Sequence, residues 1–233
     1  MCGRFFVVNS EKINAMLHFL QIPLTGMRFS ADIAPGSTVS IIFKDHDEVR
    51  LTDATWWLLL DQKTCKPNYR YASFNSRSDK LHQTGSLAYS PYRESRCIIP
   101  ASGFVEGLGD KKTYHQIELR DQAIAFGGIF RTWIHPNDQE ALFSASIITL
   151  PPHPKWASIH KKAFPLMLPW QNKEIVKSWL DPSQSSVDIF ERLLTPRLNV
   201  PQVITPIDRP SKRNPQGPSF CLAAEGESGT ENE

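Results

Sequence analysis

The residue with the most distinctive chemistry in this 233-residue sequence is Cys2. Position 2 becomes the first residue when Met1 is removed, and a small second side chain such as cysteine favours removal. We therefore expect the mature chain to begin at Cys2. Its α-amine and thiol, which titrate near pH ~8 and ~8.5, would then lie on adjacent carbons and both be partly nucleophilic at neutral pH. The amine can form a Schiff base with an aldehyde, after which the thiolate can close a five-membered thiazolidine ring.

Three polar residues further along the chain could assist such a reaction. Asn75 offers an amide that can hold the amine or the thiol. Glu106 follows an apolar stretch, where a half-buried carboxylate could orient the amine and shuttle protons during imine formation. His160 can give or take a proton near neutral pH. Judged by residue type alone, a turn asparagine, a solvated glutamate and a surface histidine are the commoner roles of these three.

Several segments match, in order, the motifs of one known family. They are Met-Cys-Gly-Arg-Phe (1–5), Ile-Ala-Pro-Gly (33–36), Phe-Asn-Ser-Arg-Ser-Asp (74–79), Arg-Cys-Ile-Ile-Pro-Ala-Ser-Gly-Phe-Val-Glu (96–106), Ile-Thr (148–149) and Ile-His (159–160). With these segments the chain resembles the abasic-site processing proteins, also called the SOS-response-associated peptidase family, over residues 2 to about 170. Each match is short, but the set in family order is specific.

The resemblance implies a function for the chain. Members of the family crosslink covalently to abasic sites in single-stranded DNA through the amino-terminal cysteine, which shields the lesion from cleavage. The ring-opened sugar of an abasic site carries the aldehyde that the chemistry of Cys2 requires. On this hypothesis Cys2, Asn75, Glu106 and His160 are catalytic, and His160 protonates the sugar oxygen as the ring opens.

The resemblance also suggests which residues contact DNA. Arg4 and Arg77 would flank the nucleophile, and a guanidinium group can donate two hydrogen bonds to one phosphate. Pro35 and Thr149 lie within the matching motifs and complete the predicted DNA-binding set. Basic residues at 161–162 and 209–213 could extend a track for the strand, although such charges are more often simply solvated.

Three departures from the family pattern affect the predicted site. Asp32 stands where the family usually has Asn, and an acidic side chain near a phosphate path weakens binding. Gly107 stands where a Trp usually follows the motif glutamate, so an aromatic surface is absent. The segment from His160 to Pro165 is one residue longer than usual, and this extra residue could displace the imidazole from its place in the family site.

Other functions remain compatible with the same residues. Cys2, His160 and Asn75 resemble the nucleophile, base and orienting residue of a thiol peptidase, and a self-processing activity could expose Cys2. A Schiff base on Cys2 could instead allow β-elimination, which would make the protein an abasic-site lyase. The absence of a Trp after Glu106 favours a third alternative, a single-stranded DNA-binding module without covalent chemistry.

Composition limits these choices. Hydrophobic residues make up 40% of the chain, charged residues 21%, and the formal net charge is +2. No apolar run approaches the roughly 20 residues that span a bilayer, and the amino terminus shows no signal-peptide pattern, so we expect a cytoplasmic protein without a membrane partner. The four cysteines form no CxxC pair, which favours neither a disulfide framework nor a zinc site. We expect a monomer with no metal and no cofactor.

The elements that must position these residues are mostly strands. Alternating or continuous apolar runs predict strands over 38–43, 49–59, 97–105, 113–119, 123–130 and 142–149, with a hairpin at 120–122. Apolar periodicity predicts a helix over 10–21 and a helical region over 172–194 interrupted by Pro182. The pattern favours a single α+β domain with a twisted, barrel-like, mostly antiparallel sheet and peripheral helices.

The carboxyl-terminal part has a different composition. Six prolines lie between Pro196 and Pro218, which predicts extended chain over 196–218 rather than helix. Residues 222–233 contain four Glu and no Lys or Arg, and they predict a disordered acidic tail. Without this tail, residues 1–221 carry a net charge of +6, which allows an anionic partner. We therefore place one domain over 1–221.

Overall fold

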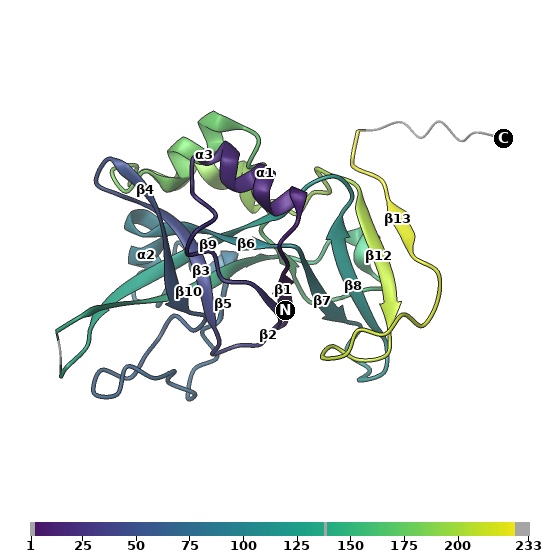
Figure 1. Ribbon diagram of the computed structural model, residues 1–233, viewed down its shortest axis with the longest axis horizontal. Coiled ribbons are helices and arrows are strands. Elements are labelled where there is room, and N and C mark those ends of the chain that lie inside the picture. Colours follow the sequence, from purple (N-terminus) through teal and green to yellow (C-terminus); the bar gives the residue numbers. More distant parts are fainter. Residues whose placement is uncertain (1–2, 138, 227–233) are drawn as a thin grey trace.

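The computed structural model describes residues 3–137 and 139–226, which form two β-sheets with short helices around them (Figure 1). The larger sheet has the strand order β11-β10-β4-β3-β6-β9, and an additional β9–β10 pairing closes five of its strands into a barrel. Its strands are β3 (Thr38–Asp45), β4 (Glu48–Thr55), β5 (Asn75–Arg77), β6 (Arg96–Ala101), β9 (Ile124–Ile134), β10 (Ala141–Leu150) and β11 (Phe164–Pro165).

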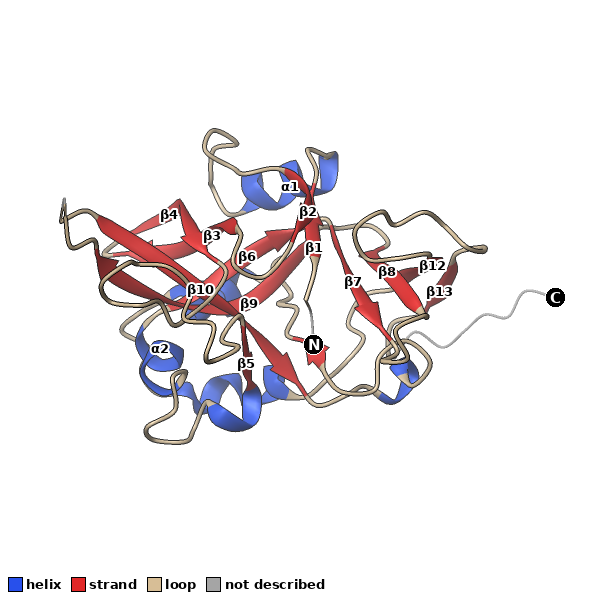
Figure 2. Ribbon diagram, turned by 90° about the horizontal axis from the view of Figure 1, so that it is seen from below, coloured by secondary structure: helices blue, strands red, loops and turns tan. Residues whose placement is uncertain are grey.

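The second sheet has the order β13-β12-β8-β7-β1-β2 and lies beside the barrel (Figure 2). Its strands are β1 (Phe5–Val7), β2 (Ser30–Ile33), β7 (Gly103–Gly107), β8 (Tyr114–Leu119), β12 (Gln202–Ile207) and β13 (Phe220–Leu222). Every pairing in this sheet is antiparallel. In both views β1 lies between the barrel and the strands β7, β8, β12 and β13 (Figure 1, Figure 2).

A nearly continuous run of chain joins the two sheets. β6 belongs to the barrel, β7 belongs to the second sheet, and only Ser102 separates them. The Ser102 backbone N–H donates to Phe6 O at 2.9 Å, which ties this junction to β1. One hydrophobic core contains side chains of both sheets, among them Phe5, Phe104 and Phe126. The prediction of a single α+β domain with a barrel-like, mostly antiparallel sheet is confirmed.

The predicted helices are also present. α1 (Glu11–Phe19) begins at Ser10, whose hydroxyl accepts from Ile13 N, and it buries Ile13, Met16 and Leu17. α3 (Lys173–Leu180) begins in the same way at Asn172. The 3-10 helix η3 (Val187–Leu194) follows after the break at Pro182. Both α1 and α3 lie over one end of the barrel (Figure 1).

The predicted hairpin at 120–122 is wrong. The strands on either side, β8 and β9, do not pair with each other: β8 lies between β7 and β12, whereas β9 lies between β6 and β10. The short connection is therefore a crossing from one sheet to the other. The connecting residues Arg120-Asp121-Gln122 also lack the glycine that short hairpin loops favour.

Two predicted strands have different limits from those expected. The segment 49–59 is a strand only to Thr55, because the chain then turns inward and the buried Trp56 donates its indole N–H to Phe74 O at 2.8 Å. The segment 97–105 is divided at Ser102 between β6 and β7. The short elements β1, β2, β5, β11 and the helix α2 (Tyr89–Glu94) were not predicted.

The carboxyl-terminal segment is more ordered than its composition suggests. Within 196–218, β12 pairs with β8 and buries Gln202 and Ile204. Residues 222–226 do not behave as a disordered tail: Leu222 ends β13, Ala224 is buried and the Glu225 N–H donates to Leu198 O at 2.7 Å. Residues 227–233, the rest of the predicted tail, lie outside the described residues.

Within the part of the chain that the structure describes, no helix combines the length and apolar character needed to cross a membrane.

Candidate functional site

Glu106 lies near the end of β7, on the same strand face as Phe104, which belongs to the hydrophobic core. β1 pairs with β7 so that Phe5 faces Phe104, and Val105 N donates to Arg4 O at 2.9 Å. This pairing places the first described residues of the chain alongside the end of β7. A hollow of about 330 Å³, here named the Glu106 pocket, is lined by Gly3, Arg4, Val105, Glu106, Gly107, Tyr114, Pro210 and Ser211.

The carboxyl group of Glu106 is desolvated. Glu106 is only 3% exposed, and this burial raises its pKa from 4.5 to about 7 because the charged form loses its hydration. Near neutral pH the carboxyl group can therefore be present in both its protonated and its charged form. A group whose pKa lies near the working pH can both donate and accept a proton, which is the property required of a general acid–base catalyst.

His160 lies against Glu106. Its Nδ1 is 2.6 Å from Gly107 O and 3.3 Å from Glu106 Oε2. Because a carbonyl oxygen can only accept, Nδ1 carries the hydrogen, and in the neutral ring Nε2 is left as an acceptor. Burial lowers the pKa of His160, the nearby Lys162 lowers it further, and the hydrogen bond to Gly107 opposes both effects. The imidazole is thus held mainly neutral near pH 7.

A buried loop positions His160. The His160 N–H donates to Trp156 O at 2.8 Å, and Trp156 packs between Phe104 and Phe164 with ring centroids 5.9 Å and 4.6 Å away. The Trp156 indole donates to Gln202 Oε1 at 2.9 Å. These contacts hold the loop against the second sheet, so the extra residue before Pro165 does not separate the imidazole from Glu106.

The other predicted residues on the barrel side form a second group. β5 pairs in parallel with β10, so that Asn75 faces Ile147 and Arg77 faces Thr149. Asn75 is half-buried at the start of β5. A hollow of about 450 Å³, here named the Arg77 pocket, is lined by Arg77, Ser78, Asp79, Thr149, Leu150, Pro151, Pro152, Lys162 and Ala163. Lys162, which lines this pocket, follows two residues after His160, which contacts Glu106.

Within the Arg77 pocket, one side chain is buried without a partner. Thr149 is 2% exposed, and its Oγ1 makes no hydrogen bond within residues 3–137 and 139–226. A buried hydroxyl without a partner is costly, and a ligand oxygen at the pocket could satisfy it. Arg77 is 68% exposed at its side chain and donates to both carboxylate oxygens of Asp79 at 2.9 and 2.8 Å.

Arg4, the predicted arginine of the Glu106 pocket, is also paired with a carboxylate. Its Nη1 donates to both oxygens of Asp32 at 2.8 and 2.6 Å. Asp32, which stands where the family usually has Asn, is therefore the ion-pair partner of Arg4. Arg213 lies beside β2, the strand that contains Asp32. It donates to Ala31 O at 2.7 Å, and its guanidinium carbon lies 4.0 Å from the centre of the Phe6 ring.

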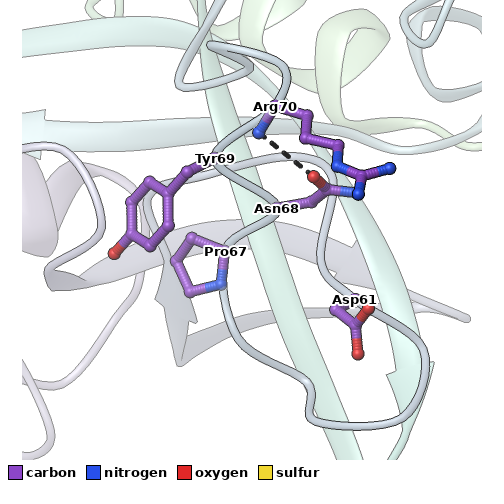
Figure 3. Close-up of a pocket in the computed structure, with 5 residues that line it drawn as sticks. All are labelled: Asp61, Pro67, Asn68, Tyr69 and Arg70. Carbon is purple, nitrogen blue, oxygen red and sulfur yellow. Dashed lines mark hydrogen bonds between the residues drawn. The ribbon is translucent and has the colours of Figure 1, made fainter.

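Pro35 lies on the turn after β2, next to an exposed aromatic loop. Gly36 in this turn has φ +91° and donates to Trp56 O at 3.1 Å, and a side chain there would meet the Tyr69 hydroxyl. Figure 3 shows Tyr69 beside Pro67, with the Arg70 backbone N–H donating to Asn68 Oδ1 at 3.2 Å.

This loop contains aromatic residues that the sequence-based prediction missed. Tyr69 and Tyr71 are 73% and 59% exposed, and Trp57 packs under Tyr69 at 5.0 Å between ring centroids. The signal in the sequence was the Tyr-Arg-Tyr triplet within a polar segment, because large aromatic side chains in such a segment have little core to enter. Trp56, by contrast, is fully buried.

A second histidine close to Glu106 was also missed. His115 on β8 directly faces Glu106 on β7, so the two side chains lie on the same face of the sheet. His115 is 8% exposed, burial lowers its pKa, and its Nδ1 has no hydrogen bond among the residues described. Because β7 and β8 are consecutive strands, the signal in the sequence was a histidine at the matching position of the strand that follows Glu106.

The structure thus brings Gly3, Arg4, Glu106 and His160 together and joins Arg77 to Thr149 in the neighbouring hollow. Cys2, the predicted nucleophile, lies outside the described residues. Among the residues that are described, no three His, Cys, Asp or Glu side chains gather in a way that could hold a metal ion.

The sequence model of the family described as SOS response associated peptidase (SRAP) matches residues 1–209, and the chain belongs to this family. A Bacillus subtilis (strain 168) protein named abasic site processing protein YoqW is 27% identical over 230 residues, covering 93% of this chain and 98% of that protein. YobE of the same strain, with the same descriptive name, is 28% identical over 204 residues, covering 84% and 89%.

A more distant relative and two solved structures are also similar to this chain. The Xenopus tropicalis abasic site processing protein HMCES is 25% identical over 207 residues, which is 78% of this chain and 60% of that protein. A Bacteroides thetaiotaomicron structure superposes with a TM-score of 0.66 at 21% identity, covering 89% of this chain and 93% of that one. A phage-related Bordetella bronchiseptica protein has a TM-score of 0.64 at 17% identity, covering 92% and 100%. These two structures support the fold.

Proposed function

We propose that this protein recognises abasic sites in single-stranded DNA and forms a thiazolidine crosslink with them through Cys2, which shields the lesion. The observation that carries the proposal is the shared pocket of Gly3 and Glu106. Gly3, which follows Cys2 in the sequence, lines this pocket together with a carboxyl group whose pKa is about 7. The curated relatives named abasic site processing proteins support the choice of substrate.

The reaction balances with the groups of Cys2 alone. The free α-amine attacks the aldehyde carbon of the ring-opened sugar and forms a carbinolamine. Water then leaves as the imine forms, and the thiolate attacks the imine carbon to form the C–S bond while the nitrogen takes a proton. The sum is one aldehyde, one amine and one thiol converted to one thiazolidine and one water, so no oxidant, metal or cofactor is needed.

The geometry suggests how Glu106 and His160 divide the proton transfers. Neutral His160 donates through Nδ1 to Gly107 O, so its Nε2 carries no hydrogen and can accept a proton rather than donate one. Glu106, with a pKa of about 7, holds the proton that the sugar ring oxygen needs when the ring opens. We therefore assign the acid role to Glu106 and the base role to His160, which reverses the assignment expected from residue type.

Three surfaces are suited to hold the strand around this pocket. Arg4 and Arg77 can donate to phosphates once they exchange their carboxylate partners. The Thr149 hydroxyl, which has no partner among the described residues, can donate to an oxygen in the Arg77 pocket. Tyr69 and Tyr71, next to the Pro35 turn, offer exposed rings on which unpaired bases can stack. Bases in a single strand expose the flat faces that stack on such rings, whereas bases in a duplex are already stacked on each other. We therefore propose that the protein binds intact duplex DNA weakly.

Intact mass spectrometry with an abasic single-stranded oligonucleotide tests the proposal. We expect a protein lacking Met1 and a heat-stable species whose mass is the sum of protein and oligonucleotide minus one water. Cys2→Ala should give no adduct, and Cys2→Ser at most a reducible Schiff base, because a hydroxyl closes the ring poorly. Cys221→Ala, which removes an exposed thiol elsewhere, is the matched control and should react like the wild type.

The same experiment separates the alternatives. A heat-stable adduct from Cys2→Ala at full yield would show that another residue is the nucleophile. Cleaved oligonucleotide in place of the adduct would indicate a lyase, and shortened protein chains that depend on Cys2 would indicate a peptidase. Binding without any covalent product would leave a single-stranded DNA-binding module.

A further inference from the structure

The carboxyl-terminal segment beyond the residues that match the family model is attached to the second sheet. Residues 210–226 follow β12, turn back and pair with it through β13. Backbone and side-chain hydrogen bonds hold the return: Gln216 N donates to Pro206 O at 2.8 Å, and the hydroxyls of Thr205 and Ser219 are 2.7 Å apart. This return places Glu225 at the loop that carries His160.

Glu225 contacts His153 at the start of that loop. His153 Nε2 lies 3.0 Å from Glu225 Oε1, and His153 Nδ1 accepts from Lys155 N at 3.1 Å. Because Nδ1 is an acceptor, Nε2 carries the hydrogen and donates to the carboxylate. His153 is 3% exposed, so water cannot readily replace this partner. The backbone of Glu225 is itself held by its bond to Leu198 O.

A short chain of hydrogen bonds leads from His153 to His160. His153 begins the 3-10 helix η2 (Pro154–Trp156), and Trp156 N donates to His153 O at 2.9 Å. His160 N then donates to Trp156 O at 2.8 Å. Before His160, the side chain of Trp156 bonds to Gln202 of β12, and the side chain of His153 bonds to Glu225, which follows β13. The first lies within the family match, and the second reaches beyond it.

We propose that Glu225 is a positioning residue: through His153 it holds the 153–160 loop so that the His160 imidazole stays against Gly107 and Glu106. The carboxyl-terminal segment thereby becomes part of the architecture of the site, and Glu225 acts on His160 through His153. The effect on the reaction rests on the crosslinking function proposed above. The effect on the imidazole does not, because it concerns this chain alone.

The first test measures the His160 imidazole by NMR in full-length variants. Glu225→Ala removes the acceptor, and we expect the pKa of His160 to rise toward its ordinary value as the loop opens to water. Removing a negative charge alone would lower that pKa, so the direction separates loop release from charge. Glu225→Gln keeps an acceptor oxygen but not the charge, and it should keep the imidazole close to its wild-type state. Arg197→Ala, which removes the other partner of Glu225, is the control.

The second test measures single-turnover crosslinking across DNA concentrations. For Glu225→Ala we expect a rate at saturating DNA about tenfold lower, because one hydrogen bond that orders the loop is lost, with the half-saturating concentration unchanged. Glu225→Gln should restore most of the rate, and Arg197→Ala should match the wild type. If Glu225→Ala left both the pKa of His160 and the crosslinking rate at saturating DNA at their wild-type values, the proposal would be overturned.

The two tests distinguish the failure of either proposal. If the pKa of His160 rises in Glu225→Ala but the wild type forms no adduct with abasic DNA, the positioning role of Glu225 is supported and the crosslinking function is refuted. An equal loss of rate in Glu225→Ala and Glu225→Gln would show that the charge, rather than the hydrogen bond to His153, matters, and would refute the anchor.

Discussion

The two groups of candidate residues, the acid–base pair and the arginines, differ in their exposure to solvent. Glu106 and His160 are buried, with side chains 3% and 9% exposed, and no arginine is among the causes of their shifted pKa values. Arg4 and Arg77 are 28% and 68% exposed, and each is paired with a carboxylate on the surface, Asp32 and Asp79. The acid–base pair is thus controlled by desolvation, whereas the arginines are controlled by exchangeable ion pairs.

This difference predicts different sensitivities for reaction and binding. In a desolvated pocket the loss of one group changes the energy of a charged state by several kcal/mol, because water cannot compensate. Exposed ion pairs contribute about 0–1 kcal/mol each and are screened by salt. Substitutions in the Glu106 pocket should therefore change rates strongly, and substitutions at the arginines should change affinity moderately and in a salt-dependent way.

The largest effect is expected from Glu106→Gln. Loss of the acid–base group should slow crosslinking by about 10²–10⁴-fold and leave DNA affinity within about twofold of the wild-type value. The wild-type rate should be bell-shaped in pH, rising with the free amine toward pH ~8 and falling as Glu106, with its pKa of about 7, loses its proton. The variant should lose the falling limb. Single-turnover gel assays across pH measure both.

Glu174→Gln makes the same change at an exposed position on α3 and should behave like the wild type. If Glu106→Gln weakened DNA binding as much as it slowed the reaction, the pocket would be a binding site rather than a reaction site, and the contrast between the two groups would be lost.

His160→Ala should have the second largest effect, a reduction of about 10²-fold in rate with little change in affinity, because it removes the base and exposes Glu106 to water. His160→Gln, which can still donate to Gly107 O, should recover part of the rate. A wild-type rate in His160→Ala would remove this residue from the site and leave Lys161 or solvent to transfer the proton.

A third prediction concerns stability and does not depend on DNA. The pKa of Glu106 is raised from 4.5 to about 7 on folding, so the folded state binds the proton more tightly between these values. The free energy of unfolding should therefore fall as the pH rises through this window, by at most about 3 kcal/mol. Urea denaturation at pH 5 and pH 8 measures this difference in the free energy of unfolding. The part caused by Glu106 should be present in the wild type and missing in Glu106→Gln. Equal losses in both would mean that the carboxyl group is solvated.

The smallest expected effect is that of Asp32→Asn, which frees Arg4. We expect single-stranded DNA to bind a few-fold tighter, and the slope of log K against log salt to steepen by about 0.7 for one additional phosphate contact. Cys2→Ala background protein keeps the measurement non-covalent. Asp53→Asn, which frees Arg28 outside both pockets, is the control. Weaker binding by Asp32→Asn would mean that the ion pair holds Arg4 in its binding orientation.

Much of the fold could be predicted because its signals are local. Ser10 and Asn172 act as helix caps next to apolar stripes, and the long apolar runs became the barrel strands. The hairpin predicted at 120–122 was wrong because strand pairing is not a local signal. β8 and β9 are consecutive in the chain, but β8 pairs with β7 (103–107) and β12 (202–207). Partner choice depends on burial of side chains from distant segments, which no local pattern contains.

For the site, the sequence by itself determined which reactive groups the chain carries: the amine and thiol of Cys2, the motif that ends at Glu106, and the Ile-His pair at 159–160. Only the tertiary structure decided their states. The pKa of Glu106 follows from its burial on the core face of β7, the tautomer of His160 from the carbonyl of Gly107, and the pairing of Arg4 from β2 beside β1. Residue type sets which atoms can react, but desolvation and hydrogen-bond partners come from segments far apart in the chain, so the protonation states depend on the folded arrangement.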